Sequence, residues 1–138
     1  MRIAVDFDGT IVEHRYPEIG KEIPFAVATL KQLIREGHLL ILWSVREGEL
    51  LDEAVEWCRA KGIEFYAVNS DYPDEDETLS KKISRKLKGD LFIDDRNVGG
   101  LPDWGVIYEM INSNKTYEQV LREMINAPKP EKKPWWKF

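Results

Sequence analysis

Two groups of carboxylates stand out in this chain of 138 residues. The first lies in Asp6-Phe7-Asp8-Gly9-Thr10, directly after a short apolar run. Side chains alternate along an extended chain, so we expect Asp6 and Asp8 on one side and Phe7 in the core. Gly9 permits a sharp turn off a strand, and Thr10 offers a hydroxyl and an amide to an anion. The alternative is an ordinary turn whose acids satisfy backbone donors.

The second group is the adjacent pair Asp94-Asp95, which follows another apolar run and precedes Arg96. Two neighbouring ionised carboxylates repel each other, and a cation relieves that repulsion. Mg²⁺ suits such a place because it prefers oxygen ligands. Arg96 as the counter-ion of a hydrated loop is the alternative. Taken together with Asp6 and Asp8, the pair predicts a magnesium site.

Ser44 and Arg46 form a third candidate, after a further apolar run. The Ser44 hydroxyl can donate to a phosphoryl oxygen, and Arg46 can reach the same ligand as a forked donor. Equally, Ser44 can be a helix N-cap with Glu47 as its capping-box partner. A basic segment further along the chain offers one cation that would stabilise transferring charge, although most of its members are expected to solvate a helix face. Its members are Lys81, Lys82, Arg85, Lys86 and Lys88.

The elements that must position these residues follow from hydrophobic patterning. Five short apolar runs predict strands buried on both faces, as in a parallel sheet. They cover residues 3–5, 39–43, 65–68, 91–93 and 105–108.

Between the runs, apolar residues recur at helical spacing, which predicts four helices. The first begins near Pro24 and ends at Gly37, and the second covers 47–61 and ends at Gly62. A short helix is expected over 79–87, and a last one over 117–125 has an inward stripe formed by Val120, Leu121 and Met124. Alternating strands and helices predict βαβ units, in which ligands bind beyond the carboxyl ends of the strands. Asp6, Ser44 and Asp94-Asp95 fall at such ends.

Length and composition predict one domain over residues 1–126 and an extended Pro/Trp tail over 127–138. Hydrophobic residues make up 43% of the chain, and its formal net charge is −5. That charge argues against a general nucleic-acid binder, which is usually basic. The single cysteine, Cys58, excludes an internal disulfide and fits a reducing compartment. We expect a cytoplasmic protein, because no apolar run is long enough to span a membrane and the N-terminus does not read as a secretory signal.

The segment Asp6-Phe7-Asp8-Gly9-Thr10 resembles the opening motif, Asp-x-Asp-x-Thr, of the haloacid dehalogenase (HAD) superfamily of aspartyl phosphohydrolases. Ser44 matches the second motif of that family, and Asp94-Asp95 matches the acidic fourth motif. The third motif is a lysine, for which Lys86 is the match and Lys82 the second choice. The resemblance runs from about residue 3 to 95 and implies a HAD-like, Rossmann-like three-layer sandwich with a central, mainly parallel sheet of about five strands.

The resemblance also implies roles for these residues. Asp6 would attack phosphorus and form an aspartyl-phosphate, and Asp8 would act as general acid and then as general base. Asp6, the Asp8 backbone carbonyl and the Asp94-Asp95 pair would hold Mg²⁺. Ser44 and Lys86 would hold the phosphoryl group, together with Gly9, Thr10, Arg46 and Arg96 as further phosphate ligands. The expected activity is that of a Mg²⁺-dependent phosphatase acting on a phosphate monoester.

Members of this family often carry a cap domain, but only eleven residues lie between Val12 and Pro24. We therefore expect a capless member with an open site, whose substrate is a small phosphate or a phosphate presented on a larger molecule. The triplets Ser44-Val45-Arg46 and Asp94-Asp95-Arg96 also resemble the phosphatase half of polynucleotide kinase–phosphatases, which suggests a nucleic-acid end phosphate as one substrate. The sequence leaves open whether the protein forms a homo-oligomer.

Two alternatives compete with the phosphatase. One is a non-catalytic module that binds a metal or phosphate with the same residues. The other is a phosphoacceptor domain of the response-regulator kind, in which the acidic pair lies near the N-terminus and the acceptor aspartate on a later strand. This chain has the reverse order.

Overall fold

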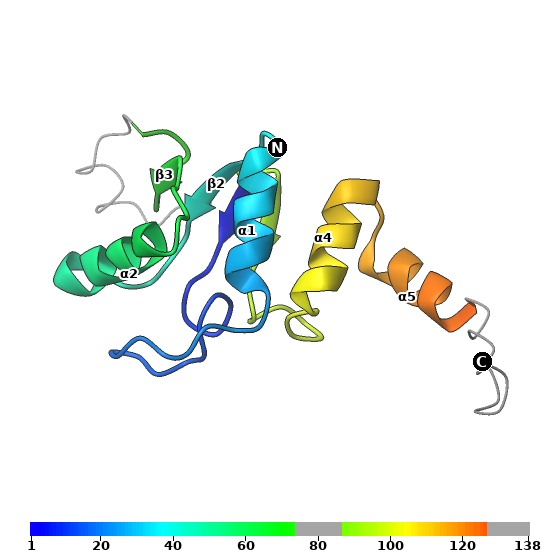
Figure 1. Ribbon diagram of the computed structural model, residues 1–138, viewed down its shortest axis with the longest axis horizontal. Helices are drawn as coiled ribbons and strands as arrows, with labels where there is room; N and C mark the ends of the chain where they lie inside the picture. The colour runs from blue at the N-terminus through cyan, green and yellow to red at the C-terminus, as the bar shows by residue number, and fades with distance from the viewer. Residues whose placement is uncertain (74–86, 127–138) are drawn as a thin grey trace, which may run out of the picture.

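The computed structural model describes residues 1–73 and 87–126 (Figure 1). Its four strands form one sheet in the order β3-β2-β1-β4, and all neighbouring strands are parallel. The strands are β1 (Arg2–Val5), β2 (Leu39–Leu42), β3 (Ala67–Val68) and β4 (Leu91–Ile93). The helices are α1 (Ala26–Arg35), α2 (Gly48–Ala60), α4 (Trp104–Ser113) and α5 (Tyr117–Asn126). The predicted α/β class with a parallel, Rossmann-like sheet is confirmed.

The strand register brings the carboxyl ends of three strands together. Val5 of β1 lies opposite Leu42 of β2 on one side and Ile93 of β4 on the other. Because β1 is central in this trio, residues that follow the three strands emerge at one edge of the sheet. Asp6 and Asp94 come directly after β1 and β4, so the register places them next to each other.

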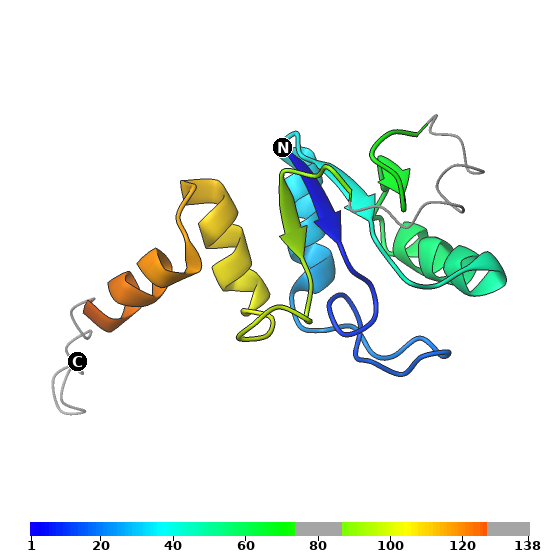
Figure 2. The same ribbon diagram turned by 180° about the vertical axis from the view of Figure 1, so that it is seen from behind.

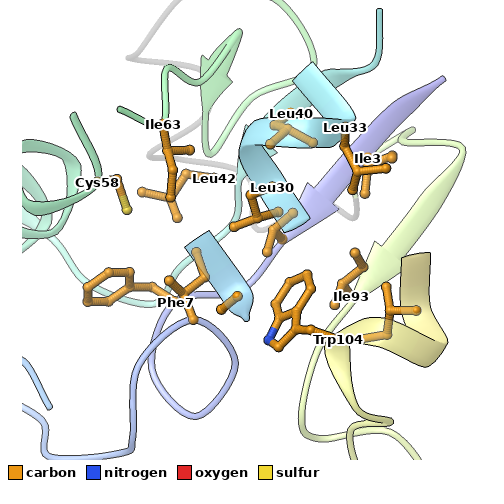
Figure 3. Close-up of a cluster of buried hydrophobic side chains, with 14 of the residues drawn as sticks. Ile3, Phe7, Leu30, Leu33, Leu40, Leu42, Cys58, Ile63, Ile93 and Trp104 are labelled. Atoms are coloured by element: carbon orange, nitrogen blue, oxygen red, sulfur yellow. The ribbon is translucent and has the colours of Figure 1, made fainter. Parts of the chain in front are cut away.

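One face of the sheet packs against α1, α2 and α4. Alternate residues of the strands point to this face, which is the pattern expected of buried strands. Figure 3 shows side chains from the strands and from these helices meeting in one cluster. Its labelled members are Ile3, Phe7, Leu30, Leu33, Leu40, Leu42, Cys58, Ile63, Ile93 and Trp104.

The other face of the sheet has a smaller buried cluster. Figure 2, seen from behind, shows β1, β2 and β4 with α1 beyond them. Ala4 and Ile41 are fully buried here, and Leu87 joins them from outside the strands. Trp43 and Phe92 complete this face with an edge-to-face ring contact, 5.2 Å between centroids. The helix predicted over 79–87 lies outside the described residues apart from Leu87.

The predicted fifth strand is wrong. Residues 105–108 belong to α4, so the described sheet has four strands rather than about five. The reason is the spacing of the buried side chains: Trp104, Ile107 and Ile111 recur at three and four residues and face the core along one side of the helix. A short apolar run does not by itself distinguish a strand from a buried helix.

The predicted inward stripe of the last helix is only partly correct. Val120 is buried, but 37% of the Leu121 surface and 60% of the Met124 surface are exposed. The cause is the position of α5, which packs against α4 and lies at the opposite end of the molecule from α2 (Figures 1 and 2). The predicted tail over 127–138 lies outside the described residues. Among the helices that the structure describes, none combines the length and apolar character needed to cross a membrane.

Candidate functional site

Three carboxylates meet at the carboxyl edge of the sheet. Asp6 follows β1, and Asp94 and Asp95 follow β4. One oxygen from each of the three lies within 4.8 Å of the others. All three side chains are partly buried. The structure thus brings together three of the four predicted metal-binding aspartates.

The crowding of these carboxylates changes the acidity of Asp6. Burial and the nearby negative charge of Asp94 raise the pKa of Asp6 to about 7. A hydrogen bond and the charge of Asp95 act in the same direction, whereas the backbone N–H of Phe7 favours the ionised form. A cation between the three groups would remove the repulsion that raises this pKa.

Gly9 and Thr10 connect the segment that follows β1 to the acidic pair that follows β4. Gly9 has a φ of +82°, and a Cβ atom there would lie 2.3 Å from Oδ2 of Asp95. The Thr10 hydroxyl accepts a hydrogen bond from the Asp95 backbone N–H at 3.1 Å. It also lies 3.4 Å from Oδ2 of Asp6 and 3.5 Å from Oδ1 of Asp95, to either of which it can donate. Only glycine fits this close approach with this backbone conformation.

The backbone amides of the same turn are already engaged. The Gly9 N–H donates to the Val12 carbonyl at 2.7 Å, and the Thr10 N–H donates to the Phe7 carbonyl at 3.2 Å. Thr10 is fully buried. In this conformation Gly9 and Thr10 shape the site and link its acids, and their amides serve the turn rather than an anion.

Asp8 is not one of the three clustered carboxylates and pairs with Arg46 instead. The Arg46 Nε donates to Oδ2 of Asp8 and its Nη2 donates to Oδ1, both at 2.7 Å. The Arg46 side chain is completely buried and 8% of Asp8 is exposed. Such a bidentate fork is a strong and directional form of ion pair. The carboxylate beside Arg46 also raises the pKa of the guanidinium above its ordinary value.

The remaining Arg46 donors bind backbone carbonyls. Nη1 donates to the carbonyls of Pro17 at 3.1 Å and Leu50 at 3.4 Å, and Nη2 also donates to the carbonyl of Glu18 at 2.9 Å. With the two bonds to Asp8, all five N–H groups of the guanidinium have an acceptor in the chain. The predicted role of Arg46 as a phosphate ligand therefore finds no support in this geometry.

Ser44 lies at the predicted edge of the sheet but does not cap α2. The Ser44 N–H donates to Oδ1 of Asn69 at 2.8 Å, and the Ser44 hydroxyl accepts from the Arg46 N–H at 3.1 Å. The N-cap of α2 is Glu47, which makes no side-chain capping bond. The capping-box interpretation of Ser44 is wrong, and its hydroxyl stays a candidate phosphate ligand.

The other predicted site residues are less closely tied to the cluster. Arg96 is exposed, and its backbone N–H donates to Oδ1 of Asp94 at 3.1 Å. Its neighbour Asn97 donates from its side-chain amide to the Asp94 carbonyl at 2.8 Å. These two bonds fix the turn that presents Asp94. Lys86 and Lys82 both lie outside the described residues.

Two positioning residues escaped the sequence analysis. Trp104, at the start of α4, donates from Nε1 to the Thr10 carbonyl at 3.1 Å in a buried bond. Asn69, after β3, fixes the backbone of Ser44. A polar residue at a strand end was the available clue for Asn69, whereas nothing in the sequence pairs a tryptophan with a loop 94 positions earlier.

A cavity among the described residues lies beside this cluster rather than over it. It has a volume of about 360 Å³ and runs between β4, the loop over 97–102 and α4. Of the three clustered acids, Asp94 alone lines it. The three carboxylates are partly buried at the carboxyl edge of the sheet.

The three acids fit Mg²⁺ in kind and nearly in spacing. Octahedral Mg²⁺ holds its ligands at about 2.1 Å, so ligand oxygens stand at most about 4.2 Å apart. The oxygens of Asp6, Asp94 and Asp95 lie within 4.8 Å of one another, so small side-chain rotations bring them into range. A hard cation with carboxylate ligands matches this set.

The fold and site define an α/β protein of Rossmann-like architecture with an acidic cluster at the carboxyl edge of its parallel sheet. One solved structure, described as that of a conserved protein coded by a locus from Bacteroides thetaiotaomicron, is 72% identical in sequence. Its TM-score is 0.80, and the match covers 87% of this chain and 96% of that one. The chain belongs to the same family as that conserved protein. No family model and no curated protein matches it.

Proposed function

We propose that the protein is a Mg²⁺-dependent phosphohydrolase that cleaves a phosphate monoester through an aspartyl-phosphate on Asp6, as a capless, HAD-like member with a three-layer sandwich fold. The observation that carries the proposal is the meeting of Asp6, Asp94 and Asp95 within 4.8 Å at the end of β1 and β4. Mg²⁺ held there would offset the negative charge of the carboxylates and of the phosphate.

Residues of the chain have separate roles in the two steps of the proposed reaction. A carboxylate oxygen of Asp6 forms a bond to phosphorus while the bond from phosphorus to the leaving oxygen breaks, and Asp8 supplies the proton that this oxygen takes up. In the second half, Asp8 accepts a proton from the water that attacks phosphorus, and Asp6 is released. Ser44 donates to a phosphoryl oxygen, and Lys86 offsets its charge.

Hydrolysis of p-nitrophenyl phosphate tests the proposal. The protein with Mg²⁺ is expected to release p-nitrophenol, and a chelator or Asp6→Asn is expected to abolish release. Asp103→Asn is the matched control, since Asp103 is an exposed acid outside the cluster that stands at the N-cap position of α4 without a side-chain capping bond. Activity that survives Asp6→Asn would exclude the aspartyl-phosphate.

The pairing of Asp8 with Arg46 favours a second candidate. A carboxylate held by two charged hydrogen bonds is engaged in the fold, which suits a module that binds a metal or phosphate without turnover. That candidate predicts Mg²⁺ binding in calorimetry together with no hydrolysis of a broad panel of nucleotides, sugar phosphates and 3′-phosphorylated oligonucleotides. Turnover of any member of the panel excludes it.

A further inference from the structure

Arg46 connects three separate parts of the chain. Its guanidinium binds the Asp8 carboxylate, the Pro17 and Glu18 carbonyls of the loop over 13–22, and the Leu50 carbonyl of α2. It is the largest charged side chain among those that the structure shows fully buried. A charge so deeply buried persists only with a full set of partners.

Two aromatic rings enclose the guanidinium. Its central carbon lies 5.3 Å from the Phe7 ring centroid and 5.2 Å from the Tyr16 ring centroid. Phe7 belongs to the core, whereas Tyr16 belongs to the loop over 13–22 and is 47% exposed. The guanidinium is thus in contact with a ring of the core and with a ring of a partly exposed loop.

The loop over 13–22 has its own backbone bonds at its base. The Glu13 N–H donates to the Lys21 carbonyl at 2.7 Å, and Val12 and Glu22 form an isolated bridge. Gly20 packs against the Glu13 carbonyl so tightly that a Cβ atom would lie 2.1 Å from it. The base is therefore fixed, and the Pro17 and Glu18 carbonyls at its tip reach Arg46.

We propose that Arg46 is a positioning residue: it sets the orientation of the Asp8 carboxylate and makes that orientation depend on the tip of the loop over 13–22. The catalytic consequence rests on the proposed phosphohydrolase function. Arg46 acts through Asp8 and does not touch the phosphate, because its five donors are used within the chain. A ligand that displaces Tyr16 or Pro17 would disturb Asp8 without reaching the acidic cluster.

Steady-state kinetics of Arg46→Lys test the first part of the proposal, that Arg46 orients Asp8 for catalysis. Lysine keeps the charge but cannot form the bidentate fork, so Asp8 loses its fixed orientation. With p-nitrophenyl phosphate and Mg²⁺, kcat is expected to fall roughly 10- to 100-fold. KM and the inhibition constant of inorganic phosphate are expected to stay within about twofold of wild type, because phosphate contacts are unchanged. Arg59→Lys, on the exposed side of α2, is the control.

Two kinetic outcomes would overturn the role of Arg46 in orienting Asp8 for catalysis. A weaker inhibition by phosphate with unchanged kcat would make Arg46 a phosphate ligand. Lower thermal stability with kcat unchanged, measured where the variant is folded, would make its role purely structural.

Amide hydrogen exchange tests the coupling independently of activity. Asp8→Ala and Arg46→Lys are both expected to speed exchange across residues 13–22, including the Glu18 amide that bonds to the Arg15 carbonyl. Ile107→Ala, a core change in α4, controls for general destabilisation and should leave that segment's relative protection unchanged. Unchanged exchange in both test variants would overturn the coupling. If the wild-type protein hydrolyses no phosphate ester, the proposed function and the catalytic role of Arg46 are both overturned. The exchange result would still decide whether Arg46 couples Asp8 to the loop over 13–22.

Discussion

Asp6 and Arg46 are two charged residues of the candidate site region whose charges are balanced in different ways. Burial, together with the nearby charges of Asp94 and Asp95, raises the pKa of Asp6 to about 7. Arg46 is buried more deeply but has a complete set of acceptors. The first arrangement has excess negative charge that a cation can neutralise, whereas the second is already balanced within the chain.

The Asp6 pKa predicts how stability depends on pH and on Mg²⁺. The pKa is raised from 3.8 in the unfolded chain to about 7 in the fold, so the folded state binds the proton more tightly between those values. The contribution of Asp6 to stability is therefore lost as pH rises through that window. The Mg²⁺ site proposed here would hold the ion through ionised carboxylates, so Mg²⁺ should raise Tm more at pH 8 than at pH 5, as measured by differential scanning fluorimetry.

Asp6→Asn provides the comparison for this measurement. It removes the titrating carboxylate, so both the pH dependence and the Mg²⁺ response are expected to shrink. Matched ionic strength with NaCl separates specific binding from screening. Equal Mg²⁺ shifts at the two pH values would contradict the prediction.

At the scale of elements, α4 connects the core to the site. Trp104 begins this helix, is 1% exposed, and donates its indole N–H to the Thr10 carbonyl. Thr10 in turn bonds to Asp95. The helix therefore holds the turn that joins the two acidic segments, in addition to covering the sheet.

Trp104→Phe tests this connection. Phenylalanine fills most of the buried space but leaves the Thr10 carbonyl without its donor, which should lower the free energy of unfolding by about 1–3 kcal/mol. Urea denaturation measures the loss. Trp57→Phe is the control, because Trp57 is only partly buried and its ring contact with Phe7 can be kept by phenylalanine. Equal losses in the two variants would show that the indole N–H has no special part.

The sequence predicts those helices and strands whose hydrophobic pattern fits only one type of secondary structure. The strand over 91–93 and the helices ending before Gly37 and Gly62 came from continuous apolar runs and periodic stripes with glycine after them. Residues 105–108 were misassigned because a short apolar run fits both a strand and a buried helix. The acidic cluster was predictable because strand ends meet at one edge in a parallel sheet. The Asp8–Arg46 pair was not, since no local pattern links residues 38 positions apart.

At the scale of the whole molecule, net charge bears on the size of the substrate. The chain has a formal net charge of −5, and its candidate site is itself acidic. If the protein is a phosphohydrolase, long polyanions will approach it less readily than small phosphates at low salt.

A series of 3′-phosphorylated oligonucleotides checks this expectation. The value of kcat/KM is expected to fall with length from a mononucleotide to about ten nucleotides at low ionic strength. Added NaCl screens the repulsion and should narrow the difference. A kcat/KM that rises with oligonucleotide length would instead indicate a surface that binds nucleic acid.

The bond between the Asp95 amide and the Thr10 hydroxyl joins residues 85 positions apart. Closing so long a segment is entropically costly, and contacts of this separation form late and slowly in folding. Asp6 therefore lies far from the adjacent pair Asp94 and Asp95 until β4 has docked beside β1. A divalent ion that needs all three ligands can bind only a chain that has finished folding. Its binding would therefore stabilise the folded chain relative to incompletely folded forms, in which the three ligands are not assembled.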